Sequence, residues 1–146
     1  MPITITRPDT TALAGFEVSL CQAGKAGDPL TDEDRLWPGL MRRAAQAHLG
    51  LWKLDALADT VDLLMSELVT NALQHGEGAV GVRVWRTGTQ LCIEVGCAST
   101  YTPRPTEAGP LDENGRGLYL VGALADGWGV TASGTWCVLT LDRSGS

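Results

Sequence analysis

The chain has 146 residues, of which 44% are hydrophobic and 19% charged, with a formal net charge of −6 and an isoelectric point of about 4.7. This length suits one domain with its own core, and this composition excludes a disordered tail and a fibrous protein. A protein that binds nucleic acid nonspecifically normally presents a basic face, so the acidic balance argues against direct nucleic-acid binding.

Neither a membrane span nor a secretory leader is expected. No run of about 18 apolar residues occurs, and residues 1–7 lack a basic start followed by an apolar core. Four cysteines are scattered without the paired spacing of metal ligands: Cys21, Cys92, Cys97 and Cys137. Together these features predict a reduced, cytoplasmic protein.

The first thirty residues predict two short strands and a loop. Ile3 and Ile5 alternate with threonines, and apolar residues alternate again over 16–20. Two glycines and a proline within 24–29 mark the loop. Residues 1–30 form an N-terminal extension that carries no recognisable motif.

Helical character begins around Thr31 or Trp37, and Pro38 suits a first helical turn, so the main helix is predicted at 37–49. Gly50 is the expected C-cap. We expect one side of this helix to carry Leu40, Ala44, Ala47 and His48, and the outward side to carry Arg42, Arg43 and Gln46. The paired arginines either form a solvated face or contact an acidic partner or a phosphate.

The next helix runs from near Asp55 to 75 and holds the most informative stretch of the chain. Its apolar stripe keeps helical spacing through Leu57, Val61, Leu64, Leu68 and Ala72. Glu67 and Asn71 are four residues apart, so they lie on one side of the helix, at the border of that stripe. They form either a solvated helix edge or a site, with Glu67 as a base and Asn71 as an oxygen ligand for a metal.

The second half of the chain predicts a hairpin, a long loop, a short helix and two more strands. Alternating apolar residues mark strands at 80–85 and 91–95 and again at 128–132 and 136–141. The loop over 98–114 is long enough to be functional or disordered. It leads into Gly115-Arg116-Gly117 and a helix over 118–125, where backbone N–H groups can approach an anion. No boundary divides residues 1–146, which are expected to form a single domain.

The combination of Glu-x-x-x-Asn on a helix, a hairpin, a proline-rich loop and Gly-Arg-Gly-Leu before a second helix resembles the GHKL ATPase/kinase superfamily. That superfamily includes DNA gyrase, heat-shock chaperones and histidine kinases. Ser-Glu-Leu-Val-Thr-Asn-Ala-Leu-Gln-His-Gly at 66–76 and Gly-Arg-Gly-Leu-Tyr-Leu-Val at 115–121 look most like the anti-sigma factor serine kinases and the related actinobacterial ATP-binding regulators. The resemblance covers about 31–142.

The resemblance implies a Bergerat fold, an α/β (α+β) two-layer sandwich whose mixed or antiparallel sheet carries helices on one face. It implies ATP and Mg²⁺ as cofactors and 98–114 as the ATP lid. Glu67 matches the base that deprotonates an acceptor hydroxyl, and Asn71 matches the Mg²⁺ ligand. Further nucleotide-binding positions match Gly115, Arg116, Gly117, Leu118 and, in a short Gly-Thr element, Thr135.

One position departs from the family pattern. The second hairpin strand normally ends in an aspartate that accepts a hydrogen bond from the adenine amino group, and here that position is Cys97. A thiol is a weak hydrogen-bond partner. Three explanations stay open: ATP binds more weakly, the site has lost adenine or nucleotide altogether, or the alignment slips. Cys97 is either a small residue at a strand end or a redox sensor.

Two functions compete at this stage. The first is an ATP-dependent serine/threonine kinase that binds a sigma factor or similar client and phosphorylates a small antagonist on serine. The alternative is a non-catalytic module that binds a partner protein with weak or lost nucleotide binding. The resemblance also implies a homodimer, and neither function involves a membrane or direct contact with nucleic acid.

Overall fold

The computed structural model describes residues 12–24, 29–75, 79–97, 120–131 and 134–141. Within them a sheet is formed by strands from both ends of the sequence, with most of the helical residues in between. The elements are β1 (Ala14–Cys21), α1 (Asp32–Arg35), α2 (Trp37–Leu51), the 3-10 turn η1 (Asp55–Leu57), α3 (Ala58–His75), β2 (Ala79–Arg86), β3 (Gln90–Cys97), β4 (Gly127–Val130) and β5 (Gly134–Thr140). Residues 120–124 add a short helical turn.

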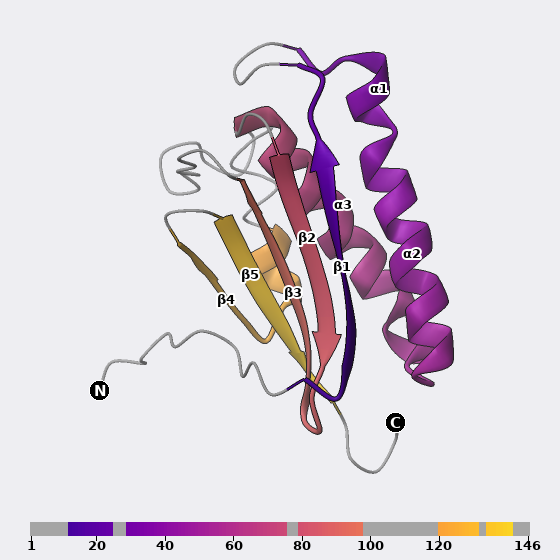
Figure 1. Ribbon diagram of the computed structural model, residues 1–146. Helices are drawn as coiled ribbons and strands as arrows, with labels where there is room; N and C mark the ends of the chain where they lie inside the picture. Colours follow the sequence, from indigo (N-terminus) through magenta and orange to yellow (C-terminus); the bar gives the residue numbers. More distant parts are fainter. Residues whose placement is uncertain (1–11, 25–28, 76–78, 98–119, 132–133, 142–146) are drawn as a thin grey trace, which may run out of the picture.

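The five strands form one sheet in the order β1-β2-β3-β5-β4, and each neighbouring pair is antiparallel. The helices lie on one side of this sheet, with α3 running behind it and α1 and α2 beside β1 (Figure 1). The predicted α/β sandwich with helices on one face is therefore confirmed. The segment 1–30 contributes β1, an edge strand that pairs with β2.

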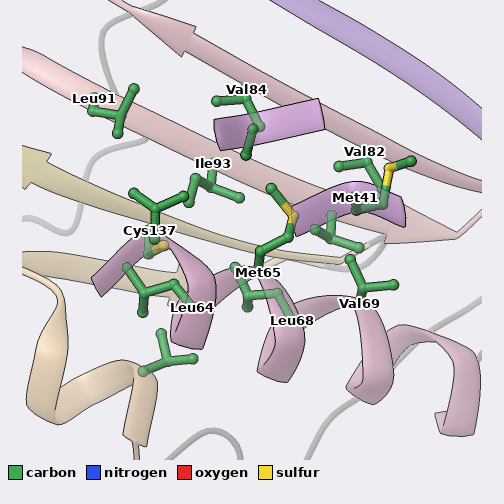
Figure 2. Close-up of a cluster of buried hydrophobic side chains, with 14 of the residues drawn as sticks. Met41, Leu64, Met65, Leu68, Val69, Val82, Val84, Leu91, Ile93 and Cys137 are labelled. Carbon is green, nitrogen blue, oxygen red and sulfur yellow. The ribbon is translucent and has the colours of Figure 1, made fainter. Parts of the chain in front are cut away.

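The main core lies between α3 and the face of the sheet that it covers, called here the inner face. Apolar residues of α3 that are at most 1% exposed include Val61, Leu64 and Leu68. They meet alternate residues of the strands, as expected for side chains on one side of a pleated sheet. Figure 2 shows this interdigitation, with side chains from α3 pointing toward Val82, Val84, Leu91, Ile93 and Cys137.

The opposite, outer face carries a second and smaller cluster. The four residues of this outer-face cluster are Trp85, Cys92, Trp136 and Val138, which are between 0% and 7% exposed. They come from β2, β3 and β5 and alternate along those strands with inner-face residues. Around these four residues, the sheet therefore carries buried apolar side chains on both faces.

The position of α2 corrects one sequence-based expectation. Its buried residues are Met41, Ala45 and Leu49, whereas Leu40, expected on the inner side, is 41% exposed. Arg42 and Gln46, expected to look outward, donate hydrogen bonds to α3 instead. Relative to the prediction, α2 is rotated about its axis. The face that meets the rest of the protein combines the apolar residues Met41, Ala45 and Leu49 with polar side chains that hydrogen-bond to α3.

The end of α2 also differs from the prediction that Gly50 is its C-cap. The helix continues to Leu51, Trp52 is the C-cap, and Lys53 has a left-handed φ of 59°. Lys53 N–H donates to Gly50 and Leu54 N–H to Leu49, the two bonds of a Schellman ending. A lysine thus holds the conformation usually given to glycine.

Two backbone amides after β1 are held by one buried carboxylate. Asp34 is fully buried, and its two oxygens accept from the N–H groups of Ala23 and Gly24, each at 2.9 Å. Thr31 caps α1 by accepting from the Asp34 N–H. These bonds tie the end of the edge strand to the helical layer. Within the described residues, no helix combines the length and the apolar character that crossing a membrane requires.

Candidate nucleotide site

Helix α3 carries both predicted helical site residues, Glu67 near its middle and Asn71 one turn before its C-terminal end. Asn71 is 3% exposed, and Glu67, one turn earlier, is half-buried. Each makes interactions with its surroundings. The prediction that they border the apolar stripe is confirmed, because Leu68 and Ala72 beside them are at most 1% exposed. A buried carboxamide and a partly accessible carboxylate on one helix side suit a ligand and a base.

A polar seam between α2 and α3 fixes this part of α3. Arg42 Nη1 donates to Ser66 Oγ at 2.8 Å, and Ser66 Oγ donates to the Asp62 carbonyl at 2.8 Å. One turn further along α2, Gln46 Nε2 donates to Asp62 Oδ1 at 2.8 Å and to the Ala58 carbonyl at 3.0 Å. Since Ser66 directly precedes Glu67, these hydrogen bonds fix the height and rotation of the part of α3 that carries Glu67.

The same end of the molecule holds the end of β3 and the start of β5 (Figure 1). Val95 pairs with Thr135, and Gly96 pairs with Gly134. Thr135 is 1% exposed and shares the inner-face register of Cys137 and Leu139. A Cβ atom at Gly134 would overlap the carbonyl oxygen of Val95, so only glycine permits this approach. The Gly-Thr element therefore brings the start of β5 against the end of β3.

Two further contacts that were not predicted from the sequence stabilise the segments at this end of the molecule. The Gln22 side chain, just after β1, donates to the Leu73 carbonyl in the last turn of α3. Val121 in the turn 120–124 is fully buried, and Gly122 lies against the Trp128 indole. Trp128 packs on the inner core, so it anchors the turn that follows Gly-Arg-Gly-Leu. In the sequence, the pattern around Trp128 predicted a strand but did not indicate that its side chain contacts this turn.

The remaining predicted positions are only partly described. Cys97 ends β3, where its backbone pairs with Val80. The glycine-rich segment, with Gly115, Arg116, Gly117 and Leu118, lies outside the described residues, as does the loop 98–114. The end of α3, the end of β3 and the start of β5 lie at one end of the sandwich (Figure 1), and they carry Asn71, Cys97 and Thr135, with Glu67 one turn before Asn71.

Comparison with known families identifies this arrangement. Residues 30–141 match the family described as histidine kinase-like ATPase domain. The chain belongs to this family. The match starts and ends close to the limits of the resemblance noted in the sequence, and it leaves out β1. No curated protein matches the chain.

Domains of the histidine kinase-like ATPase family imply binding of ATP with Mg²⁺ in general. The side chains of the described residues fit the binding of ATP with Mg²⁺ in part. No group of three or more His, Cys, Asp or Glu side chains within the described residues could hold a metal ion. Mg²⁺ commonly uses one or two protein ligands together with phosphate and water oxygens, so a single amide oxygen at Asn71 fits that chemistry. Cys97, which the resemblance matches to the adenine-binding aspartate, offers no carboxylate.

Proposed function

We propose that this chain is an ATP-binding regulatory protein of the anti-sigma factor serine/threonine kinase type. It binds a sigma factor or a similar client and phosphorylates a small antagonist protein on serine. The observation that carries the proposal is the pair Glu67 and Asn71, one turn apart on α3, with the Asn71 side chain only 3% exposed.

Each proposed site residue has a defined task in this reaction. The Glu67 carboxylate accepts the proton of the acceptor serine hydroxyl, which makes its oxygen the nucleophile. Asn71 and the segment with Gly115, Arg116 and Gly117 hold the metal and the phosphates. When bound, ATP would supply the γ-phosphoryl group and leave as ADP, and Mg²⁺ would offset the negative charge of the phosphates. The Arg42–Ser66 bond positions Glu67 without touching the reactants.

A second candidate function rests on Cys97. Losing a hydrogen bond to a charged acceptor costs about 1.5–3 kcal/mol, or roughly ten- to more than a hundredfold in affinity. A site weakened to this degree suits a module that binds its partner protein without turning over nucleotide.

A thermal melt with and without Mg-ATP, beside the same pair with GTP, separates the two functions. A ligand at about 100 times its Kd stabilises the fold by roughly 2.7 kcal/mol, which moves the midpoint of a domain this size by several degrees. A shift with ATP alone supports the kinase. Equal shifts with both nucleotides mean that phosphate binding survives without base specificity, and no shift at millimolar nucleotide favours the partner-binding module.

Substitution at Cys97 tests the adenine end of the site directly. We expect Cys97→Asp to tighten Mg-ATP binding at least tenfold, because it restores a charged acceptor. Cys97→Ser, which restores none, is the matched control. Equal affinities for the two variants would show that the pocket reads its base in another way.

The role of Glu67 is tested by turnover. We expect Glu67→Gln to reduce ATP turnover by about 10²- to 10⁴-fold, the usual contribution of a general base, and to keep the ATP-dependent shift of the melting midpoint. The neighbouring Ser66→Ala, which removes the hydrogen bonds of the Ser66 hydroxyl with Arg42 and with the Asp62 carbonyl, should reduce turnover less. Unchanged turnover in Glu67→Gln would remove the residue from the chemistry.

A further inference from the structure

Helix α2 carries two apolar stripes, and only one of them packs into the core. Met41, Ala45 and Leu49 are buried. Leu40 and Leu51, on another side of the helix, are 41% and 77% exposed. The solvent-facing side of a helix normally carries charged and polar residues, so the composition of this second stripe does not suit a solvated surface.

The second stripe consists of Leu40, Ala44, Ala47 and Leu51 and is called here the lateral stripe. These residues follow one another at helical spacing, so they lie on one side of α2. Ala47 is exposed and Ala44 is half-buried. Leu36, which is 64% exposed, lies one turn before Leu40 and lengthens the apolar surface. From Leu40 to Leu51 the stripe is about 17 Å long.

The lateral stripe lies at the side of the molecule. Helix α2 stands beside the edge strand β1, at the end of the sheet opposite β4 (Figure 1). Arg42 and Gln46 mark the side of α2 that faces α3, because both donate hydrogen bonds to that helix. At about 100° per residue, Leu40 and Leu51 lie about 160° and 180° around α2 from Arg42. The stripe is therefore turned away from α3 and towards solvent.

The order of side chains along the lateral stripe suits contact with a second copy of the same stripe. In a two-fold contact, if one residue meets another, the reverse contact forms as well. Two antiparallel α2 helices that cross at the midpoint of the stripe place Leu40 against Leu51 and Ala44 against Ala47. The alanines at the centre let the helix axes approach closely, and the leucines fill the space at both ends.

The charges beside the lateral stripe favour the same arrangement. Arg43 is exposed, and residues 36–52 contain no acidic side chain. The exposed Asp55 lies at the other end of α2, where its carboxylate is 3.8 Å from the position of a Cβ atom on Gly50. Arg43 and Gly50 are seven residues apart and share one side of the helix.

An antiparallel pair brings these opposite charges together. Arg43 of one copy then lies only about 3 Å along the helix axis from Gly50 of the other copy, and so beside its Asp55. The pairing forms twice, once on each side of the two-fold axis. A parallel pair would instead place the two Arg43 side chains against each other, which is unfavourable.

We propose that two copies of this chain associate through their lateral stripes, packed antiparallel, with Arg43 of each copy beside Asp55 of the other. The contact buries the exposed leucines of α2 and uses no residue assigned to nucleotide binding. Its test is therefore independent of the proposed kinase function.

The mass in solution tests the apolar part of the contact. Sedimentation velocity from low to high micromolar concentration compares the wild type, Leu40→Asp/Leu51→Asp and the matched control Leu63→Asp, whose leucine is 49% exposed on α3. We expect a dimer for the wild type and the control, and association at least about tenfold weaker for the stripe variant. Circular dichroism reports whether each variant is folded.

A charge exchange tests the polar part without touching a leucine. Arg43→Asp places two carboxylates together, and Asp55→Arg places two guanidinium groups together, so each change alone should weaken association. The combination Arg43→Asp/Asp55→Arg restores opposite charges and should recover most of the wild-type affinity.

Disulfide cross-linking tests the antiparallel register. The chains carry Cys21→Ser, because Cys21 is exposed, and this chain without an added cysteine is the control. Under oxidation, a mixture of Leu40→Cys and Leu51→Cys chains should form a linked dimer. Either chain alone should form little, since the two copies of residue 40 lie about 16 Å apart along the helix axis.

Several outcomes would overturn the proposal. One is a wild type that stays monomeric up to high micromolar concentration. Another is a dimer whose affinity is unchanged in Leu40→Asp/Leu51→Asp, which would assign the contact to another surface. The absence of recovery in the charge exchange, or equal cross-linking of Leu40→Cys with itself and with Leu51→Cys, would exclude the antiparallel arrangement.

Discussion

The two faces of the sheet bury apolar side chains in different ways. The inner face meets α3, so strand and helix side chains interdigitate in two layers (Figure 2). Among the described residues, the outer face holds one layer of apolar side chains, in which two indoles lie beside a thiol and a valine. The strand alternation is the same for both faces. The alternation of side chains along the strands decides which residues share a face. The element that packs on a face decides how much that face contributes to stability.

The largest expected effect comes from truncating the inner core at α3. Leu68 is 1% exposed and lies among strand side chains, so Leu68→Ala should destabilise the protein by about 2–5 kcal/mol through lost contacts and a residual cavity. Leu63 on the same helix is 49% exposed, and Leu63→Ala is the matched control, with an expected loss below about 0.5 kcal/mol. Urea denaturation measures both. Similar losses would contradict the division between a buried and an exposed side of α3.

A smaller effect is expected where the strands approach most closely. Gly134→Ala forces a Cβ atom into the Val95 carbonyl oxygen and should cost about 1–3 kcal/mol. Because the clash lies beside Thr135, Mg-ATP should also stabilise this variant less. Gly81 has nothing within 4 Å of an added Cβ atom, so Gly81→Ala is the control for a glycine in the same sheet. Equal midpoints for both variants in urea would show that the β3–β5 contact can relax.

The smallest effect concerns the thiol on the inner side. Burial, and to a lesser degree the nearby Cys92, raises the pKa of Cys137 from 9.0 to about 12. The unfolded chain therefore loses this proton from about pH 9, while the folded chain keeps it, and stability falls as pH rises from 9 towards 12. Between pH 8 and pH 10 the wild type should lose about 1.4 kcal/mol more than Cys137→Ala. Urea denaturation at both pH values measures this, and Cys21→Ser should keep the wild-type loss.

Most of the fold could be predicted from the sequence. The stripe on α3 and the alternation in β2 and β3 gave the right elements, because each has one period and one plausible buried side. The face of α2 was wrong for a physical reason. Its residues offer two apolar stripes, one with Leu40 and one with Met41, and periodicity alone does not reveal which meets α3. The polar partners Ser66 and Asp62, distant in sequence, decide the matter.

The candidate site was predictable where a motif lies on one element. Glu67 and Asn71 share a helix, so their spacing fixes their common side. Thr135 was singled out only by the resemblance of Gly134-Thr135 to a family element, and its pairing with Val95, a contact between distant segments, was not predicted. The outer-face cluster was missed although its signal was present, since Trp85, Trp136 and Val138 occupy alternate positions expected to be polar on an open face.

The strand order also has a consequence for how the chain folds. The β2–β3 hairpin joins neighbours in sequence and follows α3 directly, so its pairing closes only a short loop. The pairings β1–β2 and β3–β5 must each close a longer loop, which is slower. We therefore expect the helical pair and the central hairpin to assemble first, with β1 and the β4–β5 hairpin added afterwards. Backbone amides of the two edge strands should then exchange with deuterium sooner than those of β3.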